Sequence, residues 1–172
     1  MAGRFAVLCL AFSLAACQSA SEPASPALAF DPVEAAFINK KGKVAIEGRA
    51  FLHRKNGVVV EAGGEIVRLI PVTRYAEDRF RRLYRDKKIA GGFLAPQLEP
   101  ADPRYEKLIR TTKSDFNGTF AFADVGRGRY YLATQFQFSG DSKYFQEGGA
   151  FYDEVTITGK EVEPVKVVLS GN

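Results

Sequence analysis

Few side chains in this 172-residue chain could support metal or redox chemistry. His53 is the only histidine, so neither a metal site with two histidine ligands nor a histidine-based catalytic constellation can form. The two cysteines, Cys9 and Cys17, lie near the amino terminus. We therefore expect no metal site, no cofactor and no catalytic residues.

Carboxylates are the remaining candidates for catalysis, because hydrolysis of a glycosidic bond needs only two carboxyl groups at a suitable separation. The carboxylates considered for this role are those of Asp141, Asp153 and Glu154. Nothing in their spacing places them in one pocket, so a small carboxylate-dependent hydrolase is an alternative and a protein that is not an enzyme is the main prediction. Asp115 of the "DFNG" stretch has too few acidic neighbours for a calcium loop and is predicted to form a turn.

Aromatic side chains on or near the predicted strands are candidates for sugar binding. Tyr131, Tyr144, Phe145 and Tyr152 could present flat rings to the apolar face of a sugar. In a sheet protein, aromatic residues also fill the core, and this chain lacks tryptophan, which forms the strongest platforms. Both interpretations stay open; in the sugar-binding one, Tyr131 and Tyr152 are the binding residues.

A basic segment is the second candidate binding surface. Its members are Arg74, Arg79, Arg81, Arg82 and Arg85. Clustered cations attract anionic lipid headgroups or polyanionic glycans, and Arg79, Arg82 and Arg85 are the expected contacts. The alternative is a solvated helix face, because Glu77, Asp78 and Asp86 dilute the positive charge.

The amino terminus predicts export. Arg4 precedes an apolar run from Phe5 to Ala16 that is too short for a permanent membrane span, which is typical of a signal peptide. The sequence Leu14-Ala15-Ala16-Cys17 resembles a bacterial lipobox, which implies lipidation of Cys17 (palmitate and related acyl chains) and cleavage of the chain just before it, so that Cys17 becomes the first mature residue. The alternative is an ordinary secretory signal cut elsewhere. Because Gln18 follows instead of aspartate, the resemblance favours an outer-membrane lipoprotein facing the periplasm or the cell surface.

The rest of the chain is predicted to be a tether and one domain. Residues 17–40 are rich in Ser, Ala, Glu and Pro without periodicity, so they are interpreted as the lipidated cysteine and a flexible tether. Residues 41–172 have the length of a single domain. The net charge of +4 is only mildly basic, and we expect no nucleic-acid partner. The expected partners are the membrane, through the lipid, and an envelope protein or a glycan; the oligomeric state stays open.

Alternation of apolar and polar residues predicts seven strands after Lys43. Val44, Ile46, Ala50 and Leu52 point to one side of the first strand, and Glu47, Arg49 and His53 to the other. The same pattern recurs in segments starting near residues 65, 107, 119, 128, 150 and 163. Strands with one apolar face each are satisfied when two sheets pack face to face, so we predict an all-β sandwich.

A motif within these strands carries a family resemblance. Its residues are Asp115, Gly118, Phe120, Phe122, Val125, Gly128, Tyr130 and Leu132. They resemble the "D-x-x-G-x-F-x-F … L-x-x-G-x-Y-x-L" signature of carboxypeptidase regulatory-like domains, sharply only over residues 112–132. The resemblance implies a seven-stranded transthyretin-like (prealbumin-like) sandwich and a non-catalytic accessory module.

An insertion of about 73–105 departs from that pattern, and its first part is predicted to be an amphipathic helix. Thr73 is a suitable N-cap, Lys87 and Lys88 would lie in the last turn, and Gly91-Gly92 would end the helix. An apolar stripe at helical spacing predicts packing on the sandwich; it consists of Ala76, Phe80, Leu83 and Tyr84. The proline-rich remainder is expected to lack regular structure.

These observations lead to three functional hypotheses from different classes. The first is a lipid-anchored, non-catalytic module of the bacterial envelope that mediates protein or surface interaction. The second is a carbohydrate-binding module with a transthyretin-like fold, and the third is the small hydrolase. They differ in what they require of the surface. The first predicts scattered polar groups at the rim and no deep pocket, the second an exposed coplanar strip of aromatic side chains, and the third two carboxylates in one cleft.

Overall fold

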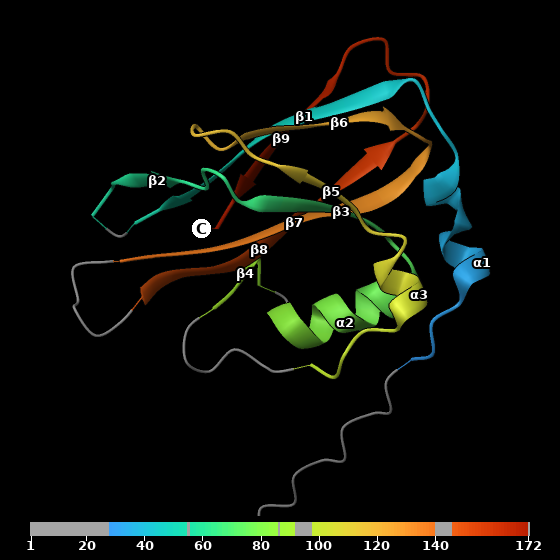
Figure 1. Cartoon of the computed structure of the whole chain (residues 1–172), viewed down its shortest axis with the longest axis horizontal. Helices are drawn as coiled ribbons and strands as arrows, with labels where there is room; N and C mark the ends of the chain where they lie inside the picture. The colour runs from blue at the N-terminus through green and yellow to red at the C-terminus, as the bar shows by residue number, and fades with distance from the viewer. Residues whose placement is uncertain (1–27, 55, 86, 92–97, 140–145, 172) are drawn as a thin grey trace, which may run out of the picture.

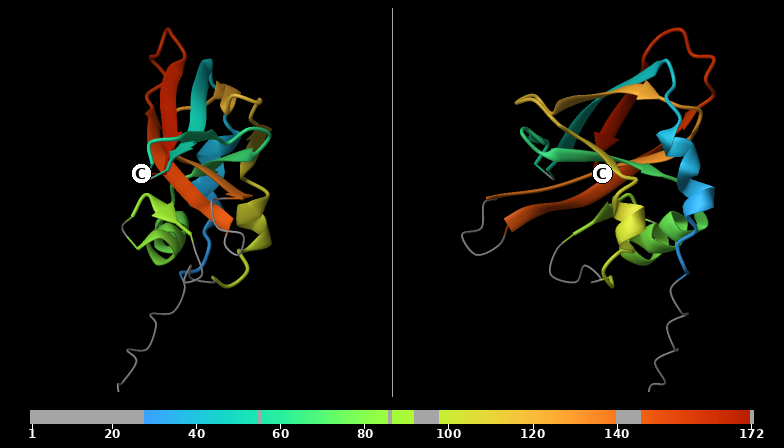
Figure 2. Two further views of the ribbon diagram at one scale, coloured as in Figure 1. Left: turned by 90° about the vertical axis from the view of Figure 1, so that its left-hand side faces the viewer. Right: turned by 45° about the vertical axis from the view of Figure 1, so that its right-hand side comes forward.

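The computed structural model describes residues 28–54, 56–85, 87–91, 98–139 and 146–171. Two β-sheets stack on each other, and two helices, α2 and α3, lie against the outer face of one of them (Figures 1 and 2). The predicted all-β sandwich with one inserted amphipathic helix is therefore confirmed, but with nine strands in the described residues instead of seven.

The first sheet is built around β1 (Val44–His53). One edge of β1 pairs antiparallel with β6 (Thr119–Val125), and the opposite edge pairs in parallel with β9 (Val165–Ser170). The short strand β2 (Val59–Glu61) pairs with the carboxyl-terminal end of β1.

The second sheet is antiparallel throughout. Its strands, in spatial order, are β4 (Ile89–Ala90), β8 (Gln146–Ile157), β7 (Gly128–Ser139), β3 (Ile66–Pro71) and β5 (Arg110–Lys113). The two strands that the sequence pattern missed are β2 and β4, which have three and two residues. Such segments are too short to display an alternation that could be recognised.

The core between the sheets follows the predicted period of two. Its fully buried members are Ile46, Ala50, Val67, Leu69, Tyr130, Leu132, Phe151, Ile157 and Leu169, together with Phe120 and Phe122. The opposite residues of β1 and β3, such as His53 and Arg68, are exposed, as predicted. Burial of one apolar face from each sheet is the main source of stability in this architecture.

The predicted turn at Asp115 joins β5 to β6 across the two sheets. The Asp115 carboxylate accepts hydrogen bonds from the backbone N–H groups of Asn117 (2.9 Å) and Thr119 (2.8 Å). Gly118 has a φ of +72°, a conformation that glycine adopts without strain. The residues Asp115 and Gly118 of the motif therefore serve to reverse the direction of the chain. Phe116 lies at the tip of the turn and is 94% exposed.

A second apolar cluster covers the outer face of the second sheet. Helix α2 (Arg74–Tyr84) presents Tyr75, Ala76, Phe80 and Tyr84 to Tyr131 and Ala133 of β7. Its N-cap is Thr73, as predicted, whose hydroxyl accepts a hydrogen bond from the N–H of Ala76 (3.1 Å). The predicted helical stripe thus packs on the sandwich.

The predicted position of the carboxyl-terminal end of this helix was wrong. The helix ends at Tyr84, because Arg85 takes the left-handed conformation (φ 50°) and its N–H bonds to the carbonyl of Arg81 (2.8 Å). Lys87 and Lys88 therefore lie beyond the helix, and Ile89–Ala90 pair with β8. Part of the stretch expected to be irregular forms α3 (Pro103–Glu106), with Asp102 as its N-cap and Pro103 in its first turn.

Residues 28–40 were predicted to belong to the flexible tether, but they have regular structure. Helix α1 (Pro32–Ala35) and a 3₁₀ turn (Ala36–Asn39) run along one end of the two sheets (Figure 1). Phe30 and Ala35 are buried in the apolar cluster on the outer face of the second sheet, and Ile38 is buried in the core between the sheets. None of the helices in the described part of the chain is long and apolar enough to cross a membrane.

Candidate functional site

A cavity of about 280 Å³ opens on the outer face of the second sheet, where helices α2 and α3 meet it. Its apolar lining comes from β3, β7, β8, α2, α3 and the segments flanking α3: Ile70, Ala133, Ala150, Phe80, Leu83, Tyr84, Tyr105, Ala101 and Ile109. Sites for small ligands have volumes of roughly 300–1,000 Å³ and a mostly apolar wall with a few polar groups, so this cavity is near their lower limit.

Two groups of packed aromatic rings hold the walls of the cavity in place. On the α3 side, Phe30, Tyr75 and Tyr105 pack edge to face with ring centroids 5.0–5.7 Å apart. On the α2 side, Phe80 stacks on Tyr131 of β7 at 4.2 Å and also contacts Tyr84 at 5.3 Å. Because Tyr105 and Tyr84 belong to different groups and both line the cavity, its two sides are fixed by the packed core.

The hydroxyl groups of Tyr84 and Tyr105 are the most informative polar atoms of the site. Each side chain is only 4% exposed, yet no group in the described residues hydrogen-bonds to either hydroxyl. By contrast, the hydroxyl of Tyr75 accepts from the N–H of Asp102 and that of Tyr130 donates to the carbonyl of Gly126. Neither hydroxyl is among the fully buried polar atoms without a partner, so each keeps some accessible surface while its side chain lines the cavity, and both are available to a ligand.

These two hydroxyls are neutral at physiological pH, and burial moves them further from ionisation. Burial is the largest cause that raises the pKa of Tyr84 and of Tyr105 well above the ordinary value of 10. Each group therefore keeps its proton at physiological pH. A neutral phenol can both donate and accept a hydrogen bond, as a sugar hydroxyl also does.

Arg68 and Gln135 provide polar groups at the mouth of the cavity. They project from the outer face of β3 and β7, and both are exposed. Neither side chain has a hydrogen bond or ion pair with another described residue. Glu106 of α3 lines the same cavity, so guanidinium, amide and carboxylate groups surround an apolar floor.

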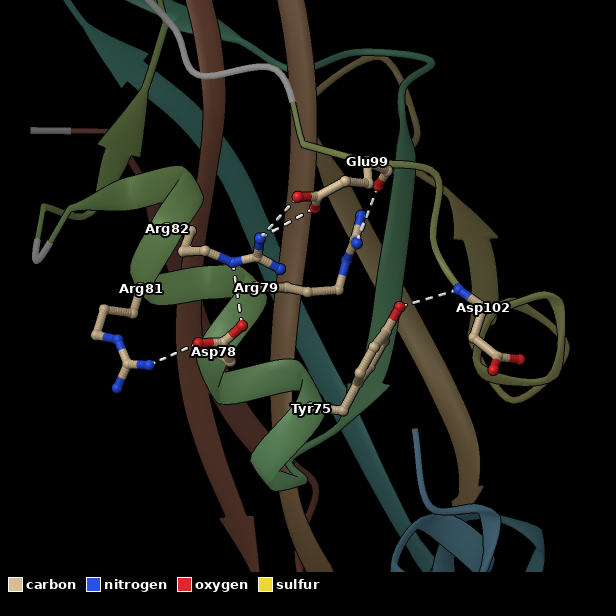
Figure 3. A network of polar contacts seen from close by, with 7 residues as sticks. All are labelled: Tyr75, Asp78, Arg79, Arg81, Arg82, Glu99 and Asp102. Atoms are coloured by element: carbon tan, nitrogen blue, oxygen red, sulfur yellow. Dashed lines mark hydrogen bonds and ion pairs between the residues drawn. The ribbon is translucent and has the colours of Figure 1, made fainter. Parts of the chain in front are cut away.

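Arg79 is the one predicted binding residue that lines this cavity. Its guanidinium donates to the backbone carbonyl of Glu99 (3.0 Å) and lies 5.7 Å from the ring centre of Tyr75 (Figure 3). These contacts fix the side chain as a wall of the cavity.

Arg82, by contrast, belongs to an ion-pair network in which its own side chain and that of Asp78 are partly buried (Figure 3). Its guanidinium contacts the carboxylates of Asp78 (3.0 Å) and Glu99 (3.0 Å). Asp78 also pairs with Arg81 (2.6 Å). The backbone N–H of Glu99, followed by Arg82, lowers the pKa of the Glu99 carboxyl, so this carboxylate stays ionised and offsets the charge of the helix.

The predicted basic surface is therefore largely neutralised. Arg74 at the start of α2 lies 3.6 Å from Glu34 of α1. Arg85 is exposed and forms no side-chain pair with other described residues, but it is a single charge at the end of the helix. This arrangement favours the solvated-face interpretation over binding of an anionic surface.

The predicted aromatic platform is not an exposed surface. Tyr131 is 7% exposed and lies beneath Phe80. Tyr152 of β8 is half-buried and contacts Tyr84 (4.4 Å) and Phe80 (4.9 Å). Both tyrosines support the wall of the cavity from behind instead of offering a face to a sugar.

The carboxylates considered for hydrolysis do not come together. Asp153 and Glu154 are consecutive in β8, so their side chains point to opposite faces of the sheet. Each has a cationic partner: Lys88 lies 2.8 Å from Asp153, and Arg129 lies 2.7 Å from Glu154. His53 is exposed next to the ring of Phe51. Within the described ranges, no three His, Cys, Asp or Glu side chains are grouped to hold a metal ion.

Several sequence predictions concern residues outside the described ranges. These are Cys17 with the signal peptide and most of the tether, Asp86, Asp141, Tyr144 and Phe145. For these residues, the sequence-based expectations stay predictions.

Sequence reasoning missed four residues of the cavity: Arg68, Tyr84, Tyr105 and Gln135. Tyr84 was assigned to the helical stripe, and its packing role is correct. The signal for Tyr105 was Asp102-Pro103, an N-cap followed by proline, which indicates a helix start in the stretch taken as a loop. Arg68 and Gln135 gave no local signal, because polar residues on the outer face of a strand are common.

Comparison with known proteins supplies one informative similarity. The fold is similar to the crystal structure of a "putative carbohydrate binding protein" from Pseudomonas aeruginosa, with a TM-score of 0.72 and 26% sequence identity. The match covers 84% of this chain and 99% of that one. No family model and no curated protein matches the sequence. The resemblance to carboxypeptidase regulatory-like domains therefore stays a prediction, and the comparison shows a similar fold in another protein.

Proposed function

We propose that this chain is a non-catalytic carbohydrate-binding module held at the bacterial envelope by lipid on Cys17. The cavity between the second sheet and helices α2 and α3 is the binding site. The chain does no chemistry on the sugar; it recognises the sugar and keeps it near the membrane.

The observation that carries this proposal is a pair of tyrosine hydroxyls, on Tyr84 and Tyr105, that have no hydrogen-bond partner among the described residues and belong to side chains lining an aromatic-walled cavity. A net hydrogen bond contributes about 0.5–1.5 kcal/mol. A ligand rich in hydroxyl groups can form such bonds with both phenols. Sugars also have apolar C–H faces that suit the floor formed by Ile70, Ala133 and Ala150.

The similarity to a protein described as carbohydrate-binding supports the same class of ligand. The broader idea of a protein-interaction module has no comparable support, because the basic helix is internally paired. Lipid anchoring is supported by the lipobox-like sequence before Cys17.

Binding is tested with detergent-purified protein on an array of bacterial and plant glycans, followed by calorimetric titration of the best ligand. Tyr84→Phe and Tyr105→Phe each delete one hydroxyl and keep the ring, and each is expected to weaken binding about five- to tenfold. Tyr131→Phe is the matched control, because Tyr131 lies in the same aromatic cluster but does not line the cavity, and it is expected to bind like the wild type. Equal binding by all four proteins would contradict the proposed site.

Anchoring is tested separately by incorporation of labelled palmitate in cells. Cys17→Ala is expected to abolish labelling and to release the protein from the membrane fraction, since acyl chains supply about 0.8 kcal/mol for each buried methylene. Cys9→Ala, a change of the other cysteine, is expected to leave labelling unchanged. Labelling that persists in Cys17→Ala would contradict the lipid anchor.

A further inference from the structure

A second hollow continues the candidate site along the outer face of the second sheet. It has a volume of about 290 Å³ and is lined by Glu65, Ile66, Arg68, Gln135, Phe136 and Gln137. Arg68 and Gln135 also line the cavity between the sheet and helices α2 and α3. The two hollows therefore lie next to each other, with these two side chains between them, and together they are called the groove below.

The groove follows the direction of β3 and β7. Ala133, Gln135 and Gln137 lie on one face of β7, because alternate residues of a strand share a face. The distance along the strand from Ala133 to Gln137 is about 13 Å at roughly 3.3 Å per residue, which is longer than one pyranose ring. The cavity at the helices extends the groove further, so its length suits a chain of sugars better than a single one.

The charges along the groove are balanced. Arg68 and Arg79 are positive, and Glu65 and Glu106 are negative. The other polar groups are the amides of Gln135 and Gln137 and the neutral hydroxyls of Tyr84 and Tyr105. A polyanionic chain would place repeated negative charges next to Glu65 and Glu106, whereas an uncharged chain meets donors and acceptors along its whole length.

We propose that the groove binds an elongated, uncharged glycan of several sugar residues, with one end in the cavity under α2 and α3 and the rest along β3 and β7. This inference rests on the proposed function and specifies its ligand. Gln135 connects the two halves, and Gln137 contacts only the sugars farthest from the helices.

The experiment is calorimetric titration of the full chain with three ladders from one to six sugar residues. Two ladders are neutral, of N-acetylglucosamine and of glucose, and one is of uronic acids. At least one neutral ladder is expected to gain at least tenfold in affinity between the monosaccharide and the tetrasaccharide, and the uronic acid ladder is expected to bind more weakly at every length.

Variants show which part of the groove supplies the gain in affinity for longer sugars. Gln137→Ala is expected to reduce the affinity of the tetrasaccharide by at least threefold and to leave the disaccharide unchanged. Thr156→Ala, an exposed change on β8 that lies outside both hollows, is the control and is expected to match the wild type at every length.

The outcomes separate this inference from the proposed function. Neutral sugars that bind with the same affinity at all lengths would overturn the elongated ligand while leaving carbohydrate binding intact. Preferential binding of the uronic acid ladder would overturn the uncharged ligand. Failure of every ladder and every array glycan to bind would overturn both.

Discussion

At the scale of single residues, the account depends on whether a polar group has found a partner inside the fold. Tyr75 and Tyr130 have hydrogen-bonded hydroxyls and are structural. Tyr84 and Tyr105 are buried to a similar degree and lack such bonds among the described residues. In the proposed function, this difference distinguishes the hydroxyls of Tyr75 and Tyr130, which stabilise the fold, from those of Tyr84 and Tyr105, which bind the ligand.

The Asp115 turn gives the first prediction at this scale. Asp115→Ala removes the acceptor of two backbone hydrogen bonds and is expected to lower the free energy of unfolding by about 1–2 kcal/mol. Phe116→Ala in the same turn changes a side chain that is 94% exposed and is expected to alter it by less than about 0.5 kcal/mol. Chemical denaturation measures both; equal losses would contradict the role of the carboxylate.

Glu161, in the turn between β8 and β9, predicts a pH dependence of stability. Hydrogen bonds, first from the backbone N–H of Thr158, lower the pKa of Glu161 from 4.5 to about 2. The carboxylate form is thus favoured in the folded state, so its contribution is present above pH 4.5 and is lost as the pH falls toward 2.

Replacing this carboxylate tests the predicted direction of the pH dependence of stability. Glu161→Gln is expected to flatten the fall in stability between pH 4.5 and about 2, measured by denaturation at a series of pH values. Val162→Ala, a change at an exposed neighbour in the same turn, is expected to keep the wild-type profile. A steeper fall in Glu161→Gln would contradict the assignment.

At the scale of elements, the site is made where helices α2 and α3 cover one part of a sheet and leave the next part open. The first residue beyond α2, Arg85, is in the left-handed conformation that glycine adopts without strain. Arg85→Gly is expected to raise the free energy of unfolding by about 0.5–1 kcal/mol and to leave glycan binding unchanged. Lys87→Gly, at an exposed position without positive φ, is the control and is expected to lower the free energy of unfolding slightly. A loss of stability in Arg85→Gly would contradict this cap.

The sequence predicted those elements whose burial has a repeating pattern. The inner faces of β1, β3, β7 and β8 alternate with exposed or helix-covered residues, so the sandwich and its core could be derived from period two. The stripe of α2 could be derived from helical spacing. The end of α2 could not, because Lys87, Lys88 and Gly91 fit a longer helix equally well until Arg85 interrupts it.

The candidate site was far less predictable, for a physical reason. Its groups come from β3, α2, α3 and β7, and they converge only when the two helices pack on the sheet. Tyr131 alternates like a surface residue of its strand but is covered by Phe80 of α2. Of the five binding residues predicted, Arg79 alone lines the cavity. The sequence shows which residues are cationic or aromatic, but whether the outer face of a sheet is covered depends on segments that are distant in the sequence.

At the scale of the whole molecule, the architecture separates stability from recognition. One face of the second sheet is buried in the core with the first sheet, and helices α2 and α3 lie against its other face (Figure 2). The groove also lies on that outer face. In the proposed function, a sugar bound on that outer face leaves the main core unchanged. Groove variants that conserve volume are therefore expected to alter affinity with little effect on stability.

The most direct test of the central claim is a crystal structure of the protein with the tightest-binding neutral oligosaccharide from the array. The account predicts sugar density along β3 and β7, with sugar hydroxyls within hydrogen-bond distance of the Tyr84 and Tyr105 hydroxyls and beside Arg68. Sugar density confined to another surface, such as the solvent side of α2 or the exposed face of the first sheet, would contradict it.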